Sequence, residues 1–152
     1  MKNRIQKIDA FRITIERRKL ARDKKSVQKI FEVLEDCGIP CECMAINIDW
    51  LAIVIRETEL GKVNRFVEQL GRELSNTEIC INGKIVLLYL ENGQITSRRI
   101  GMLISSLAIQ DIDIVMQRYI KCEDRLVIGT SVEDAERARD IIREVLDSYY
   151  RA

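Results

Sequence analysis

The sequence contains no histidine, one proline, one tryptophan and only 5% aromatic residues. Without histidine, a cysteine nucleophile lacks its usual activating base, and general acid–base catalysis lacks its commonest group. No glycine-rich phosphate loop and no metal-spaced set of carboxylates is present. We therefore expect no catalytic residues, no cofactor and a binding or regulatory role rather than an enzyme.

Long apolar runs and a strong net charge are also missing. The 152 residues carry a formal net charge of +1, so no global field attracts nucleic acid or an anionic membrane. No run approaches the ~18 apolar residues of a membrane span, and the N-terminal MKNRIQKIDA does not resemble a signal peptide. We expect a cytoplasmic protein of ordinary globular composition with neither nucleic acid nor membrane as a partner.

The five cysteines do not form a recognisable framework. Their number is odd and their spacing irregular, unlike the disulfide pattern of a small secreted domain. Without histidine, a zinc site needs three or four cysteines or carboxylates to converge. We expect no metal site and predict that most of these side chains are small buried hydrophobes: Cys37, Cys41, Cys43, Cys80 and Cys122.

Apolar periodicity predicts alternating helices and strands. Stripes with helical spacing indicate helices over 26–37 and 59–74, starting at caps Ser26 and Thr58, and two more that start at Ser97 and Ser131. Asn82-Gly83 predicts a tight turn between two strands. Strands are predicted over 5–8, 11–16, 41–45, 51–55, 77–81, 85–90, 112–120 and 126–129.

The apolar pattern repeats. Val27 and Ile100, Leu34 and Leu107, and Ile55 and Ile128 each lie 73 positions apart, and Phe66 and Ile141 lie 75 apart. Such a repeat predicts two copies of one α/β unit, over 9–82 and 83–152. The second copy lacks a final strand, which residues 4–8 at the N-terminus can supply.

Two segments carry a family resemblance, 38–55 (GIPCECMAINIDWLAIVI) and 111–128 (DIDIVMQRYIKCEDRLVI). They resemble ACT domains, and two in tandem resemble the C-terminal regulatory region of aspartokinase (aspartate kinase). The matching positions are Gly38, Ile39, Glu42, Met44, Ile48 and Asp49, then Ile112, Asp113, Ile114, Met116, Glu123 and Gly129. The resemblance implies an α+β fold of two ferredoxin-like βαββαβ units, with antiparallel sheets and helices on one face of each.

The resemblance also implies a function in amino-acid biosynthesis. It implies allosteric regulation by an amino acid effector of the lysine or threonine type, a homodimer formed by sheet pairing, and an aspartokinase catalytic subunit as a partner. The kinase half with its Lys-Phe-Gly-Gly loop has no counterpart here. The implied effector-binding residues are Asp23, Lys24, Lys25, Ser26, Val27, Met44, Ala45, Ile46, Asn47, Ile48 and Asp49.

Alternatives remain open at each of these positions. Segment 23–27 either clasps an amino acid or is an ordinary helix start, and 47–49 either completes the pocket of a facing subunit or is a polar bend. The chain is a free-standing regulatory subunit, a detached fragment, or a relative without a ligand that serves as a dimerisation module. An RNA-binding domain shares the βαββαβ order, but it needs aromatic residues on its central strands that this chain lacks.

Overall fold

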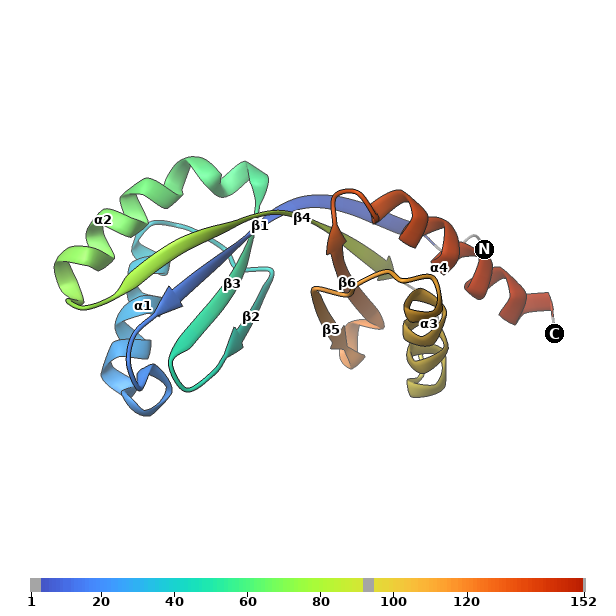
Figure 1. Ribbon diagram of the computed structural model, residues 1–152, viewed down its shortest axis with the longest axis horizontal. Helices are drawn as coiled ribbons and strands as arrows, with labels where there is room; N and C mark the ends of the chain where they lie inside the picture. The colour runs from blue at the N-terminus through green and yellow to red at the C-terminus, as the bar shows by residue number, and fades with distance from the viewer. Residues whose placement is uncertain (1–3, 92–94, 152) are drawn as a thin grey trace. The chain divides into compact units, whose positions relative to one another are not determined.

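A computed structural model describes residues 4–91 and 95–151 (Figure 1). Short 3-10 helices occupy Leu20–Arg22, Glu57–Lys62 and Lys121–Glu123. The strands and α-helices in these residues are β1 (Arg4–Glu16), α1 (Lys24–Asp36), β2 (Cys43–Ile46), β3 (Trp50–Arg56), α2 (Val63–Glu73), β4 (Glu78–Glu91), α3 (Ser97–Ile109), β5 (Met116–Ile120), β6 (Arg125–Ser131) and α4 (Ala135–Arg151).

The strands are hydrogen-bonded in the order β2-β3-β1-β4-β6-β5. Strand β3 pairs antiparallel with β1 and β2, and β6 pairs antiparallel with β4 and β5. The chain divides into two compact units. The first unit is Ala10–Lys84, and the second combines the chain up to Asp9 with the chain from Ile85 onwards. The first unit has the order βαββαβ, and the second has the same arrangement with the N-terminal part of β1 in the place of its last strand. The α+β, ferredoxin-like prediction is thus confirmed.

Strands β1 and β4 are each continuous and contribute to both units. The predicted break after Ile8 and the predicted tight turn at Asn82-Gly83 are therefore wrong. Gly83 has a φ of +112° within β4, a conformation that suits glycine, and the Asn82 amide oxygen accepts a hydrogen bond from the Thr14 hydroxyl of β1. A glycine inside a strand thus replaces the expected turn.

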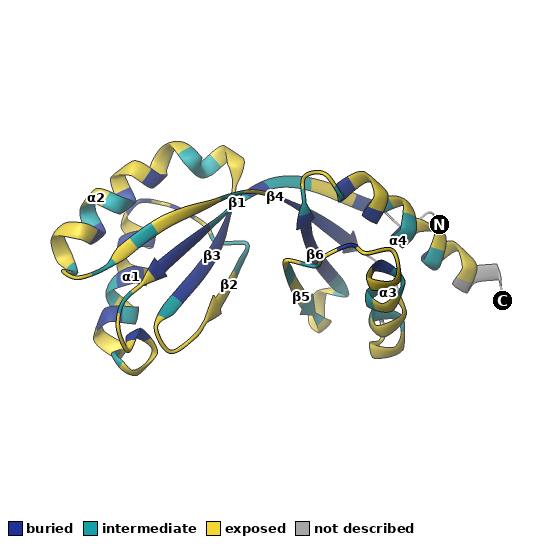
Figure 2. Ribbon diagram, in the orientation of Figure 1, coloured by how far each residue is buried: buried dark blue, intermediate teal, exposed yellow. Residues whose placement is uncertain are grey.

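In the first unit, alternate residues of the strands point to a core that α1 and α2 cover (Figures 1 and 2). This alternation follows from the two-residue period of a strand. Ile30 and Leu34 of the predicted α1 stripe are buried, but Val33 is buried in place of Phe31, which is 37% exposed. The largest members of this core are Ile13, Ile15, Ile30, Leu51, Ile53, Ile55, Phe66 and Leu70.

In the second unit, β4 and β6 provide the corresponding strand residues and α3 and α4 the helices. Ile5 of β1 is buried in this second core, far in sequence from its other members. Figure 2 shows the same division along β4, which is mostly exposed in its first half and buried in its second. The core residues include Val86, Leu88, Leu90, Leu103, Leu107, Leu126, Ile128, Ala138 and Ile142.

The helix starts differ from the predicted ones. The N-cap of α1 is Asp23 rather than Ser26, and that of α3 is Thr96 rather than Ser97. Each of these caps stands before the predicted one, and all four are residue types that cap helices. Helix α2 begins at Val63, after 3-10 turns, and has no side-chain cap, so the Thr58 prediction is also wrong. The Ser131 hydroxyl accepts a hydrogen bond from the Asp134 backbone N–H just before α4.

The repeat is visible in the helix ends. Helices α1 and α3 start 73 residues apart and also end 73 apart. Gly38 and Asp111 both have positive φ after these helices, and the N–H groups of Ile39 and Ile112 bond back to Leu34 and Leu107 at 3.0 Å.

The predicted correspondence of Ile55 with Ile128 is wrong by two residues, because Ile53 is the residue of the first unit that corresponds to Ile128. Gln117 pairs with Ile128 in β5 and β6, just as Met44 pairs with Ile53 in β2 and β3. The two-residue insertion therefore lies at the connection through Lys121–Glu123 and precedes β6. Strand β5 also begins at Met116, four residues later than predicted.

The cysteine prediction is wrong for most positions. Cys37 alone of the five is buried, while Cys41 and Cys43 are half-buried and Cys80 and Cys122 are exposed, all as free thiols. In residues 4–91 and 95–151 no group of three metal-ligating side chains converges. None of the helices in the same ranges is long and apolar enough to cross a bilayer.

Candidate functional site

The two segments of the predicted effector site lie side by side within one chain. The Arg17 N–H donates to the Asp49 carbonyl at 2.9 Å, and the Ala21 N–H donates to the Ile48 carbonyl at 3.0 Å. The Lys19 N–H adds a bond of 2.8 Å to Asp49 Oδ1. These three bonds fix the β2–β3 turn against the segment that leads from β1 to α1.

The start of α1 is already occupied by a carboxylate. Asp23 accepts hydrogen bonds from the Ser26 hydroxyl at 2.6 Å and the Ser26 N–H at 3.2 Å. These bonds, the hydroxyl bond foremost, lower the pKa of Asp23 below its usual 3.8. The carboxylate of a ligand would have to displace Asp23 to reach the N–H groups of the helix start. Ser26 itself is buried.

A hollow of about 510 Å³ lies beside the first half of α1, and we call it the α1 hollow. Lys24, Val27 and Ile46 of the predicted site line it. Lys24 is exposed and gives the hollow a positive group, whereas Val27 and Phe31 give it apolar lining. Its remaining lining residues are Ala21, Gln28, Glu32 and Glu35.

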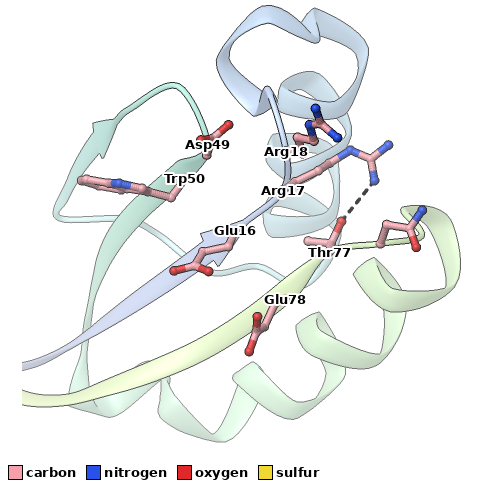
Figure 3. Close-up of a pocket in the computed structure, with 8 residues that line it drawn as sticks. Glu16, Arg17, Arg18, Asp49, Trp50, Thr77 and Glu78 are labelled. Carbon is pink, nitrogen blue, oxygen red and sulfur yellow. Dashed lines mark hydrogen bonds between the residues drawn. The ribbon is translucent and has the colours of Figure 1, made fainter.

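A second hollow, of about 630 Å³, lies at the ends of β1, β3 and β4, and we call it the Trp50 hollow (Figure 3). Asp49 is the single residue of the predicted site that lines it. The remaining predicted residues, which line neither hollow, are Asp23, Lys25, Ser26, Met44, Ala45, Asn47 and Ile48. The other lining residues of the Trp50 hollow are Glu16, Arg17, Arg18, Trp50, Asn76, Thr77 and Glu78.

Sequence reasoning missed the Trp50 hollow because its walls come from three separate segments. Arg17 and Arg18 belong to a basic run that is typical of a solvated loop. Glu78 joins them only because β4 lies next to β1 in the sheet. No motif links these positions along the chain, although the lone tryptophan was the one available signal.

The edge strand β2 exposes apolar side chains. Met44 and Ile46 are 47% and 53% exposed, and Ile48 in the following turn is 54% exposed. Met44 and Ile46 pair with Ile53 and Leu51, whose side chains lie in the helix-covered core. They therefore extend the apolar face of the sheet towards the half-exposed Phe31 of α1.

No protein-family model matches the sequence, and no curated protein matches it either. Solved structures do match. The regulatory subunit of aspartate kinase from Thermus thermophilus, in its ligand-free form, aligns with a TM-score of 0.77 at 14% identity, over 93% of this chain and 97% of that one.

The chain has the fold of aspartate kinase regulatory subunits. Clostridium acetobutylicum aspartate kinase aligns with a TM-score of 0.76 at 22% identity over 93% of this chain. Escherichia coli aspartokinase III, in complex with lysine and aspartate, aligns with a TM-score of 0.59 at 14% identity over 95% of this chain. This chain spans 34% of the Clostridium kinase and 32% of the Escherichia coli one. The tandem ACT-like arrangement of an aspartokinase regulatory region is thus present in this chain.

Proposed function

We propose that this chain is a cytoplasmic allosteric module that binds an amino acid of the lysine or threonine type and regulates an aspartate kinase catalytic partner. The observation that carries the proposal is the end-to-end match to a separate regulatory subunit, which extends over 97% of that chain. Supporting it, one relative of the same fold was solved with lysine and aspartate bound. We infer a non-catalytic role, so the chain by itself should not phosphorylate aspartate with ATP.

The effector of this proposal binds between the start of α1 and the β2–β3 turn. Because Asp23 occupies the helix N–H groups, the side chains of Lys24 and Lys25 take the effector carboxylate instead. Both lysines are exposed, and Lys24 reaches the α1 hollow. The apolar wall of Val27, Phe31 and Ile46 accommodates the aliphatic part of the effector.

A second copy of the chain completes this site in our proposal. The unpaired edge of β2 and the exposed Met44, Ile46 and Phe31 form an apolar surface that water solvates poorly. Pairing of two such edges covers this surface and places the turn of one copy, residues 47–49, near the α1 hollow of the other. An effector held between two copies favours one packing over another, and a coupling of about 1–3 kcal/mol suffices for ordinary allosteric control.

Calorimetric titration of lysine and threonine into the protein tests the proposed site. We expect saturable binding of at least one of them, and about tenfold weaker binding to the double variant Lys24→Gln, Lys25→Gln, because a charged partner of the carboxylate is lost. Lys121→Gln, an equally conservative change in the second unit, is the matched control. Equal affinities for all three proteins would contradict the placement of the site, and no heat of binding for either amino acid would contradict the effector.

A ligand-free dimerisation module is the second candidate function. The exposed apolar edge of β2 favours it independently of any effector. A dimer in sedimentation measurements that dissociates in the variant Ile46→Lys, in a protein that binds no amino acid, would support this candidate over the first.

A further inference from the structure

We propose that the Trp50 hollow is a second binding site, which takes a small zwitterion with one carboxylate and one or two ammonium groups. It lies apart from the site at the start of α1, and either site can fail without the other. The inference rests on the charges that face this hollow and on which of them already have partners.

Two of the charged groups in the hollow are used by the fold. The Arg17 guanidinium donates to the Ser75 carbonyl and, at 3.5 Å, to the Thr77 hydroxyl, a bond drawn in Figure 3. The Asp49 carboxylate accepts the Lys19 N–H at 2.8 Å. These bonds hold the three wall segments together, so the hollow is built by specific contacts.

Three other charged groups in the hollow have no partner among the described residues: the carboxylates of Glu16 and Glu78 and the guanidinium of Arg18. Glu16 pairs with Trp50 across β1 and β3, which places these two side chains on the same face of the sheet. Ile15 and Ile79 belong to the helix-covered core, so their neighbours Glu16 and Glu78 lie on the opposite face. Figure 3 shows Glu16 and Glu78 on neighbouring strands, with both arginines beyond the end of β1.

The ligand chemistry follows from this arrangement. One unpaired guanidinium binds one carboxylate, and two unpaired carboxylates bind ammonium groups. The half-buried indole of Trp50 adds an apolar and cation-attracting surface to the wall of the hollow. The volume of about 630 Å³ falls within the roughly 300–1,000 Å³ typical of small-molecule pockets. A diamino acid such as lysine matches all three free charges, and a mono-amino acid matches two.

Trp50 is the only tryptophan of the chain, so its fluorescence reports on this hollow directly. The experiment titrates the full chain with lysine, with cadaverine, which lacks the carboxylate, and with hexanoate, which lacks both ammonium groups. We expect a saturable change with lysine and dissociation constants at least about tenfold higher for the other two.

Two variants assign the signal to the hollow. Arg18→Gln should weaken lysine about tenfold without weakening cadaverine, because cadaverine has no carboxylate for Arg18. Glu78→Gln should weaken both. The double variant Lys24→Gln, Lys25→Gln is the control and should leave this titration unchanged. All four positions are exposed, so these changes leave the core intact.

Two results would overturn the inference. One is a fluorescence response that survives Arg18→Gln and Glu78→Gln but disappears in the double lysine variant, which would place the only site at the start of α1 and leave the proposed function standing. The other is no saturable response to lysine while calorimetry still detects its binding. Absence of lysine binding by both methods would contradict this inference and the lysine form of the proposed function together.

Discussion

Ser26 donates both its hydroxyl and its backbone N–H to the Asp23 carboxylate, at 2.6 and 3.2 Å. These bonds stabilise the ionised form of Asp23, which is why its pKa lies below the usual 3.8. A carboxyl group with a lowered pKa stabilises the folded protein above its usual pKa, and this stabilisation is lost as the pH falls through the lowered value.

We therefore predict that Asp23→Ala lowers the melting temperature at pH 7, and that the difference from the parent protein shrinks as the pH falls below about 4. Asp23→Asn is the control, since asparagine caps a helix nearly as well without a charge, so its melting temperature should stay close to that of the parent at pH 7. Thermal unfolding followed by circular dichroism between pH 7 and pH 3 checks both. Equal melting temperatures for Asp23→Ala and the parent at pH 7 would show that this cap does not stabilise α1.

Gly129 of β6 lies where a side chain does not fit. A Cβ there would overlap Met116 Cγ and approach Leu87 and Val115 at 3.4 Å. We predict that Gly129→Ala destabilises the protein by about 1–3 kcal/mol, as overpacking of a core usually does. Gly71→Ala in α2, where a Cβ would meet nothing within 4 Å, should instead stabilise by about 0.5–1 kcal/mol. Urea unfolding of both variants measures the difference, and a neutral Gly129→Ala would mean that Met116 moves freely aside.

Ile5 tests the contribution of the N-terminal strand to the second unit. Its side chain is buried in that core, so Ile5→Ala should cost about 2–5 kcal/mol and speed hydrogen exchange at Ala138 and Ile142 of α4. Ile81→Ala, on β4 and 48% exposed, is the matched control and should cost far less. If Ile5→Ala speeds exchange only in α1 and α2, the assignment of the N-terminal strand to the second unit is wrong.

The free cysteines should differ in reactivity. Cys80 and Cys122 are exposed and should react rapidly with a thiol reagent at pH 7. The buried Cys37 should react slowly, because the reagent reaches it only when the protein opens locally. Burial, and secondarily the charge of Glu42, raises the pKa of the Cys41 thiol, which slows its reaction further. Mass spectrometry of partially labelled protein gives the order in which the cysteines are labelled. Labelling of Cys37 as fast as Cys80 would contradict the packing of α1 against α2.

The sequence predicted the helices whose positions follow from the regular spacing of apolar residues. The stripe through Ile30 and Leu34 identified α1, and the 73-residue repeat identified α3, because burial of one helix face determines both. Local signals were less reliable. Asn82-Gly83 has the chemistry of a turn, yet continuous pairing along β4 prevails, and Asp23 and Ser26 are equally good caps on sequence alone.

The candidate sites were likewise predicted only in part from the sequence. The resemblance brought together 23–27 and 44–49. In the structure Lys24, Val27 and Ile46 line one hollow, while Ile48 and Asp49 bond to the segment that leads into α1. The resemblance did not reveal that Asp23 fills the helix start. The Trp50 hollow was unpredictable because Glu16 and Glu78 become neighbours only through the order of strands β1 and β4, which periodicity does not encode.

Thermal unfolding with each of the twenty amino acids in excess tests the central proposal, amino-acid sensing, most directly. A ligand that binds only the folded state at one hundred times its dissociation constant stabilises it by about 2.7 kcal/mol. For a chain of this size, such a gain raises the melting temperature by roughly 5–10 °C. We predict a concentration-dependent rise of this kind for at least one amino acid, with lysine and threonine tested first. Twenty unchanged melting temperatures at millimolar ligand would contradict it.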